Sequence, residues 1–105
     1  MEIKPTLDQA MTYFFTADNQ ANKRVQMGLI KLQPGERSPV EGYACHEQDE
    51  YSYVVSGLAH TILEDGTDLL GTPGDAQLIV ANEKHINYND GDEEAVVVWM
   101  LVERD

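Results

Sequence analysis

Short apolar runs separated by turn residues make up most of this chain from residue 24 onward. The runs at 24–32, 50–56, 59–63, 76–81 and 95–102 alternate apolar and polar residues or are largely apolar, and each has the length of an ordinary β-strand. No stretch keeps an apolar spacing of three to four residues over several turns, so no long helix is expected. The pattern predicts an all-β domain with seven or more strands.

Turn residues lie at the ends of these runs. Pro34-Gly35 follows the first run and Gly57 the second, while the third is followed by Asp65-Gly66, a dipeptide that favours a tight hairpin. Pro73-Gly74 and the segment 89–92 provide further turns. Short strands joined by hairpins can close into a barrel or jelly roll, which limits exposed sheet edges. We therefore expect a small antiparallel barrel.

The first twenty residues differ from the rest of the chain. Residues 7–11 could form a helical turn, and Tyr13, Phe14 and Phe15 form an apolar patch that needs a surface to cover it. We expect residues 1–20 to be an N-terminal arm that packs on the barrel or on a partner. Residues 21–105 are then enough for a single domain.

Acidic side chains outnumber basic ones by 19 to 7, which gives a formal net charge of -12 at pH 7. Such a charge repels phosphate backbones and anionic bilayers, so neither nucleic acid nor a membrane is an expected partner. The longest apolar run, 95–102, is too short to cross a bilayer, and no secretory leader is recognisable. We expect a cytoplasmic protein, in which the single Cys45 forms no internal disulfide.

Two polar clusters interrupt the apolar pattern, at 46–50 and at 85–89, and together they contain His46, Glu50 and His85. Imidazole nitrogens and a carboxylate oxygen are ligands that divalent metals accept, and a set of two histidines and one carboxylate leaves coordination positions open. His46 and Glu50, four residues apart near a strand end, can face the same interior. A carboxylate inside an apolar barrel requires a cation or a hydrogen-bonding partner.

The order of these motifs resembles the cupin family, in particular its small single-domain, RmlC-like members. The first cupin motif has His-x-His, three residues, Glu, six residues and Gly, and here His46, Glu50 and Gly57 match it. The second has Gly, a short strand, a turn, His, three residues and Asn, matched by Gly74, His85 and Asn89. The resemblance covers residues 34–91 and implies a double-stranded β-helix with His46, His85 and Glu50 as metal ligands.

The chain departs from the family pattern in three places. Ala44 stands where the first motif usually has its first histidine, so one of the four usual ligands is missing. The stretch between Gly35 and Ala44 is longer than the pattern, and Val80 and Asn82 replace a common proline and glycine. Gln48 or Tyr43 could partly replace the histidine by turning inward, although both suit an exposed loop better.

Several other polar and aromatic residues have simpler interpretations. His60 suits a surface or core position better than a ligand position, and Asn89 suits a turn better than support of a ligand. Cys45 should face away from His46 by strand alternation. Arg37, near the mouth of the barrel, could meet an anionic substrate or could be a plain surface residue.

The strand aromatics Tyr51, Tyr53 and Trp99 are expected to pack between the sheets or at a dimer contact. One of them could instead stack on a substrate.

We expect a metal-dependent enzyme of the dioxygenase class, an oxidoreductase acting on a small oxygenated molecule held in the barrel. Fe(II) is the favoured ion, with Mn(II), Ni(II) and Zn(II) as the other candidates. One alternative is a non-catalytic binding module with a degenerate or empty metal site. Another, implied by the resemblance, is a metal-dependent isomerase, epimerase or lyase of sugar-like substrates. Since small cupins commonly pair, a homodimer is also expected.

Overall fold

The computed structural model describes residues 1–105 and contains nine strands and no helix. The strands are β1 (Met11–Phe15), β2 (Val25–Leu32), β3 (Arg37–Ser38), β4 (Asp49–Ser56), β5 (Ala59–Leu63), β6 (Asp68–Gly71), β7 (Ala76–Ile79), β8 (His85–Tyr88) and β9 (Ala95–Val102). No helix is present that could span a membrane. The predicted all-β class is confirmed, and the runs 59–63 and 95–102 match β5 and β9 at both ends.

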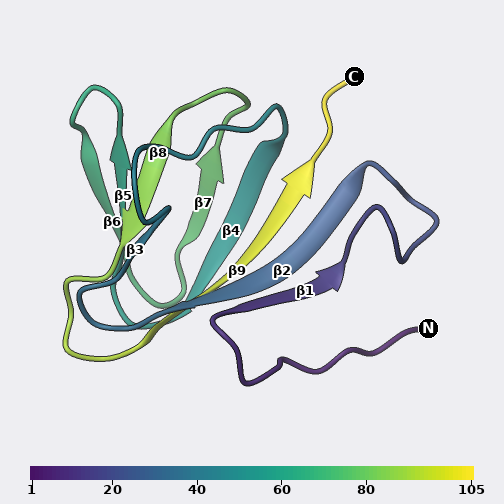
Figure 1. Ribbon diagram of the computed structural model, residues 1–105, viewed down its shortest axis with the longest axis horizontal. Coiled ribbons are helices and arrows are strands. Elements are labelled where there is room, and N and C mark those ends of the chain that lie inside the picture. The colour runs from purple at the N-terminus through teal and green to yellow at the C-terminus, as the bar shows by residue number, and fades with distance from the viewer.

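The strands form two antiparallel sheets (Figure 1). One sheet has the order β1-β2-β9-β4-β7 and the other the order β3-β8-β5-β6. Strands distant in sequence are neighbours, as where β9 at the end of the chain lies between β2 and β4. The expected hairpin at Asp65-Gly66 joins β5 to β6, and Gly66 has a φ of 90° there.

Strand alternation places one face of each sheet toward the interior. Val54, Ala59 and Val97 form the buried centre of the core, with Ile30 packed against them. Trp99 is also buried, as expected. Tyr51 and Tyr53 do not pack between the sheets, so of their two predicted roles only the dimer contact stays open.

Tyr51 and Tyr53 are 44% and 50% exposed, because their neighbours Glu50 and Ser52 occupy the inward positions of β4. Leu78 of β7 is also exposed and pairs with Tyr51 of β4. The outer face of this sheet therefore carries apolar side chains. The homodimer stays a prediction.

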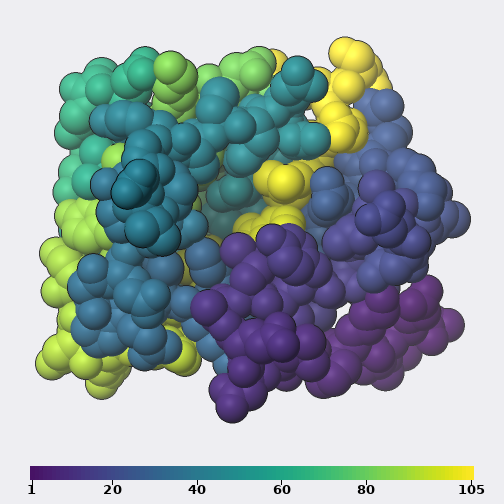
Figure 2. Space-filling model, viewed as in Figure 1, coloured from purple at the N-terminus to yellow at the C-terminus, as the bar shows by residue number.

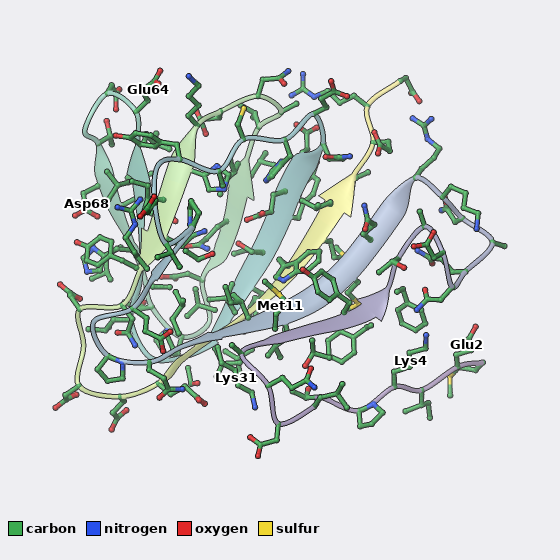
Figure 3. The ribbon with its side chains drawn as sticks, in the orientation of Figure 1. Glu2, Lys4, Met11, Lys31, Glu64 and Asp68 are labelled. Carbon is green, nitrogen blue, oxygen red and sulfur yellow. The ribbon has the colours of Figure 1, made fainter.

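The apolar patch at residues 13–15 belongs to strand β1, which pairs with β2. No helix forms at residues 7–11. Instead, Leu7 donates its amide hydrogen to Thr12 Oγ1 and accepts a hydrogen bond from Lys31 Nζ at its carbonyl. Figure 3 labels Lys4 and Lys31, which both lie near the first residues of the chain. The division of the chain at residue 20 stays a prediction.

Candidate metal centre

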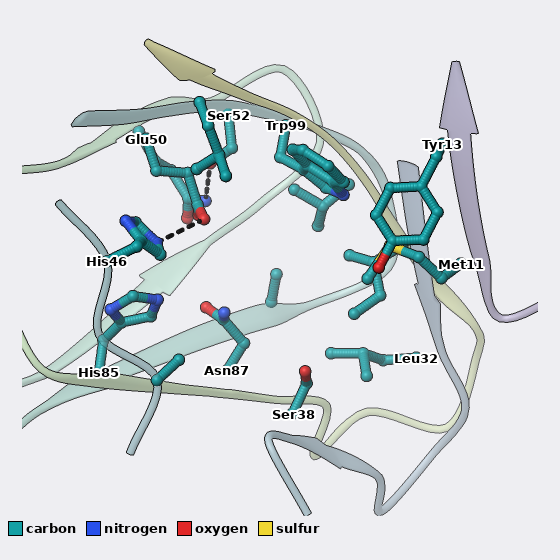
Figure 4. A pocket seen from close by; sticks show the side chains of 16 residues that line it. Met11, Tyr13, Leu32, Ser38, His46, Glu50, Ser52, His85, Asn87 and Trp99 are labelled. Atoms are coloured by element: carbon teal, nitrogen blue, oxygen red, sulfur yellow. Dashed lines mark hydrogen bonds and ion pairs between the residues drawn. The ribbon is translucent and has the colours of Figure 1, made fainter. Parts of the chain in front are cut away.

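Three potential metal ligands come together from both sheets. His46 lies in the loop before β4, Glu50 is the second residue of β4, and His85 is the first residue of β8. One ligand atom from each lies within 4.8 Å of the others. Figure 4 shows both imidazole rings and the carboxylate directed toward the same space. The structure therefore brings together the three residues that the sequence singled out.

Backbone carbonyls determine which ring nitrogen of each histidine carries the hydrogen. His46 Nδ1 lies 3.0 Å from the carbonyl oxygen of Gln48, and His85 Nδ1 lies 2.8 Å from that of Glu83. A carbonyl oxygen only accepts hydrogen bonds, so each Nδ1 must be the donor. In a neutral imidazole the Nε2 atom then has a free lone pair, which is the arrangement of metal-binding histidines.

A positive charge between His46 and Glu50 would stabilise the arrangement of these two side chains. His46 Nε2 is buried and has no hydrogen-bond partner, and it lies 3.3 Å from Glu50 Oε1. With Nδ1 as the donor, the two facing atoms both carry lone pairs and repel each other. A proton on Nε2 would relieve this one pair, whereas a divalent cation would satisfy His46, Glu50 and His85 together. The donor set thus suits a transition metal.

Backbone hydrogen bonds hold the two histidine segments next to each other. Ala44 and His85 exchange amide–carbonyl hydrogen bonds of 2.9 and 3.0 Å, and the amide of Asn82 donates to the His46 carbonyl at 2.7 Å. His85 is only 2% exposed. Ala44, at the position of the absent histidine, presents a methyl group to the cavity. The segments are therefore fixed without a fourth ligand.

A charged pair fixes the start of β4, next to Glu50. Arg104 Nε lies 2.9 and 3.0 Å from the two carboxylate oxygens of Asp49, and the amide of Ala81 donates to the same carboxylate. The hydrogen bonds from Arg104, followed by that from Ala81, lower the pKa of Asp49. Asp49 therefore remains ionised and outside the cavity, while Glu50 on the opposite side of the strand points inward.

The three ligands face a cavity of about 240 Å³ between the sheets. Its lining is mostly apolar and includes the aromatic rings of Tyr13 and Trp99, which meet edge to face with centroids 5.8 Å apart. Figure 2 shows the surface hollowed near the middle of this view, next to β9 in yellow and the N-terminal residues in purple. The remaining polar lining residues are Ser38, Ser52, Gln77 and Asn87.

The sequence analysis did not single out the four polar lining residues, but two of them could have been found. Asn87 and Ser52 lie two positions after His85 and Glu50 on the same strands, so alternation alone places them on the same face. Tyr13 gives no such signal, because its place depends on how β1 pairs with β2.

His60 lies outside the site and bridges two carboxylates. Its Nδ1 lies 2.9 Å from Asp68 and its Nε2 2.8 Å from Asp90, and its ring stacks on Tyr88. Hydrogen bonds from His60 and then Tyr88 lower the pKa of Asp68. The same carboxylate, which accepts from the phenol at 2.8 Å, raises the pKa of Tyr88 to about 12. This cluster connects β5, β6 and β8 and explains His60 without a ligand role.

The structure also places the remaining candidates away from the ligands. Asn89 is fully buried and donates to the carbonyls of Leu32 and Glu93, in keeping with the turn role. Gln48 donates to Glu103 Oε1 at 2.7 Å.

Tyr43 and Cys45 are exposed. Arg37 donates to the carbonyls of Pro39 and Gly42 in its own loop. None of the four residues Arg37, Tyr43, Cys45 and Gln48 lines the cavity, so none replaces the absent histidine.

Comparison with known proteins gives a consistent result. A family model described as "Cupin domain" matches residues 28–101. An RmlC-like cupin family protein with a double-stranded β-helix fold from Methanocaldococcus jannaschii is 16% identical, with a TM-score of 0.79 over 97% of this chain and 87% of that one. No curated protein is similar enough to match.

Two further solved structures carry names that specify an activity. A predicted oxalate decarboxylase from Thermotoga maritima is 22% identical, with a TM-score of 0.75 over 90% of this chain and 79% of that one. A sugar phosphate isomerase from Silicibacter pomeroyi is also 22% identical, with a TM-score of 0.70 over 90% of this chain and 60% of that one. At these identities the likeness shows the fold, and the predicted jelly roll is confirmed.

Proposed function

Because this chain belongs to the cupin family, we propose that it is a metal-dependent enzyme of the dioxygenase class, acting on a small oxygenated organic molecule held between its sheets. His46, Glu50 and His85 are the proposed metal ligands, and Fe(II) is the favoured ion. The observation that carries the proposal is the buried, unpartnered His46 Nε2 facing Glu50 Oε1 at 3.3 Å.

The rest of the cavity lining favours oxygen chemistry over isomerisation or elimination. Apart from the three ligands, the lining contains no carboxylate, imidazole, amine or thiol, and Tyr13 is its only other titratable residue. Isomerases, epimerases and lyases that move protons need an acid or base positioned at the reacting centre. Tyr13 lies at the end of the cavity opposite the three ligands (Figure 4). Fe(II) held by two histidines and one carboxylate would supply activation of dioxygen and polarisation of substrate oxygens.

The residues of the chain then orient the reactants and exclude water. The Nδ1–H groups of His46 and His85, held by backbone carbonyls, keep both Nε2 lone pairs directed at the site. The largely apolar walls would disfavour water beside a bound substrate. Asn87 accepts a hydrogen bond from Thr61 Oγ1 at 2.9 Å, which orients its carboxamide toward the cavity (Figure 4).

A second candidate is a cupin that binds a small molecule without catalysis. Ala44 favours it, because a methyl group occupies the position of the family's usual first histidine and lines the cavity. Both candidates use the same cavity; in the first a bound metal turns over a substrate there, and in the second the metal site is degenerate or empty.

Dioxygen uptake tests the proposed function. The protein is loaded anaerobically with Fe(II) or with redox-inactive Zn(II), and catechol and acetylacetone, two small neutral chelators, are added with ¹⁸O₂. We expect uptake of dioxygen and ¹⁸O in the product with Fe(II) only. Conversion at equal rates with Zn(II) and without dioxygen would favour an isomerase or lyase. Binding of both probes to the Fe(II) protein without any conversion would favour the binding module.

A further inference from the structure

We infer that the cavity accepts a neutral, largely apolar molecule that binds the metal through oxygen atoms at one end, and that it discriminates against phosphorylated, multiply anionic and polyhydroxylated molecules. The inference rests on the proposed function, because it takes His46, Glu50 and His85 as the metal ligands. It adds the class of substrate, which follows from the charges, walls and hydrogen bonds of the cavity.

Neither lysine nor arginine lines the cavity. The seven basic residues instead contact carbonyl groups or carboxylates elsewhere in the structure, and Figure 3 shows Lys4 and Lys31 near the N-terminal residues. Their contacts are Lys4–Glu2, Lys23–Gln20, Arg24–Asp105, Lys31–Leu7, Arg37–Pro39, Lys84–Glu64 and Arg104–Asp49. In a chain with a net charge of -12, a second anionic group on a ligand would enter a cavity with no cation except the metal.

The cavity has a polar end and an apolar end. Figure 4 places the two histidines and Glu50 at one end, and Trp99, Tyr13 and Met11 at the other. Six further aliphatic residues line the space: Ile30, Leu32, Ala44, Ala59, Val97 and Leu101. At about 240 Å³ the cavity is smaller than the pockets of roughly 300–1,000 Å³ that hold drug-sized ligands. A compact body with one polar end matches this lining.

Hydrogen bonds within the protein already use part of the polar lining. Gln77 Nε2 donates to Ser52 Oγ at 2.9 Å, and the Asn87 carbonyl oxygen is engaged by Thr61. The groups left for a ligand are the NH₂ of Asn87, the carbonyl oxygen of Gln77 and the hydroxyls of Ser38, Ser52 and Tyr13, which are spread along the cavity. A sugar with many hydroxyl groups would bury unpaired polar atoms here, at about 1–3 kcal/mol for each. A molecule with one or two oxygen atoms at its metal-binding end avoids this cost.

A matched pair of catechols tests the inference. 4-Methylcatechol and 3,4-dihydroxybenzoate share the chelating head and differ in a methyl or carboxylate group at the same ring position. Affinities for the Zn(II)-loaded protein are measured by calorimetry. Quenching of Trp99, the only tryptophan, reports binding inside the cavity. We expect 4-methylcatechol to bind at least about tenfold more tightly, equivalent to about 1.4 kcal/mol.

Two variants locate the origin of this preference. Met11→Lys places an ammonium group at the apolar end on the edge strand β1, and should reduce the preference to about threefold or less by favouring the carboxylate. Met100→Lys makes the same change on the exposed outer face of β9 and should leave the preference unchanged.

Other outcomes would overturn the inference at different levels. Equal or tighter binding of 3,4-dihydroxybenzoate by the unaltered Zn(II) protein would overturn the substrate class and leave the metal site standing. An equal effect of Met100→Lys would also overturn it, because the preference would then come from overall charge. Failure of Zn(II) itself to bind in the calorimeter would overturn the proposed function and this inference together.

Discussion

Glu50→Ala should lower the affinity for divalent metal by at least about 100-fold. Glu50 is the only anionic member of the ligand group, and even the loss of a residue that supports a ligand typically costs 10–100-fold in metal affinity. The metal content of the purified variant and calorimetric titration with Zn(II) measure the effect. Zn(II) should also no longer raise the melting temperature, since that increase depends on binding to the folded state.

The stability of the metal-free variant separates a metal site from a polar core. Without metal, the lone pairs of Glu50 and His46 Nε2 face each other, so the metal-free Glu50→Ala variant should be at least as stable as the metal-free parent protein. Glu47→Ala, which removes an exposed carboxylate from the same segment, is the matched control and should leave metal content unchanged. Either of two results would give Glu50 a structural role. Metal binding could survive Glu50→Ala, or the unaltered protein could bind no metal while the variant loses about 1–3 kcal/mol of unfolding free energy.

Gly57→Ala should reduce the free energy of unfolding by at least about 3 kcal/mol. Gly57 connects β4 to β5 with a φ of 75°, a conformation that residues with a side chain rarely adopt. A Cβ atom there would lie 2.5 Å from both the Glu94 carbonyl oxygen and Ala95 Cα. These are backbone atoms of the loop and of β9, so relief requires moving a central strand. Urea denaturation monitored by Trp99 fluorescence measures the change.

Gly66→Ala provides the comparison for this effect. Gly66 also has a positive φ, of 90°, but lies in the β5–β6 hairpin, where an added Cβ would meet nothing within 4 Å. Only the backbone cost applies, about 1 kcal/mol. Equal losses of unfolding free energy in the two variants would show that the close approach of Gly57 to β9 does not add to the cost of the substitution.

The strands that the sequence predicted well are those whose pattern is set by burial. In β9, the inward positions Ala95, Val97 and Trp99 alternate with outward ones within one continuous apolar run, so both ends of the strand could be located. The missed strands lack this signal. β3 consists only of Arg37–Ser38 and is a strand because it pairs with β8. β6 exposes both Leu69 and Leu70, so its apolar residues do not alternate.

The residues of the candidate site divide in the same way. Some are placed by the local sequence pattern and others only by pairing with distant strands. His46, Glu50 and His85 could be grouped because family motifs fix their spacing, and the structure brings them together. At the apolar end of the cavity, Trp99 was among the candidates for stacking on a substrate. Met11 and Tyr13 could not be anticipated, because they reach this end only through the register of β1 on β2. For Arg37 the sequence left two roles open, and only the structure shows that its guanidinium donates to carbonyls of its own loop.

The most direct test of the central claim, that His46, Glu50 and His85 hold a metal ion in this cavity, is anomalous diffraction from crystals of the protein grown with Zn(II), recorded on both sides of the zinc absorption edge. The account predicts one strong peak at bonding distance, about 2.0–2.2 Å, from His46 Nε2, His85 Nε2 and a Glu50 oxygen. A cavity without such a peak, or a peak only elsewhere on the acidic surface, would contradict it.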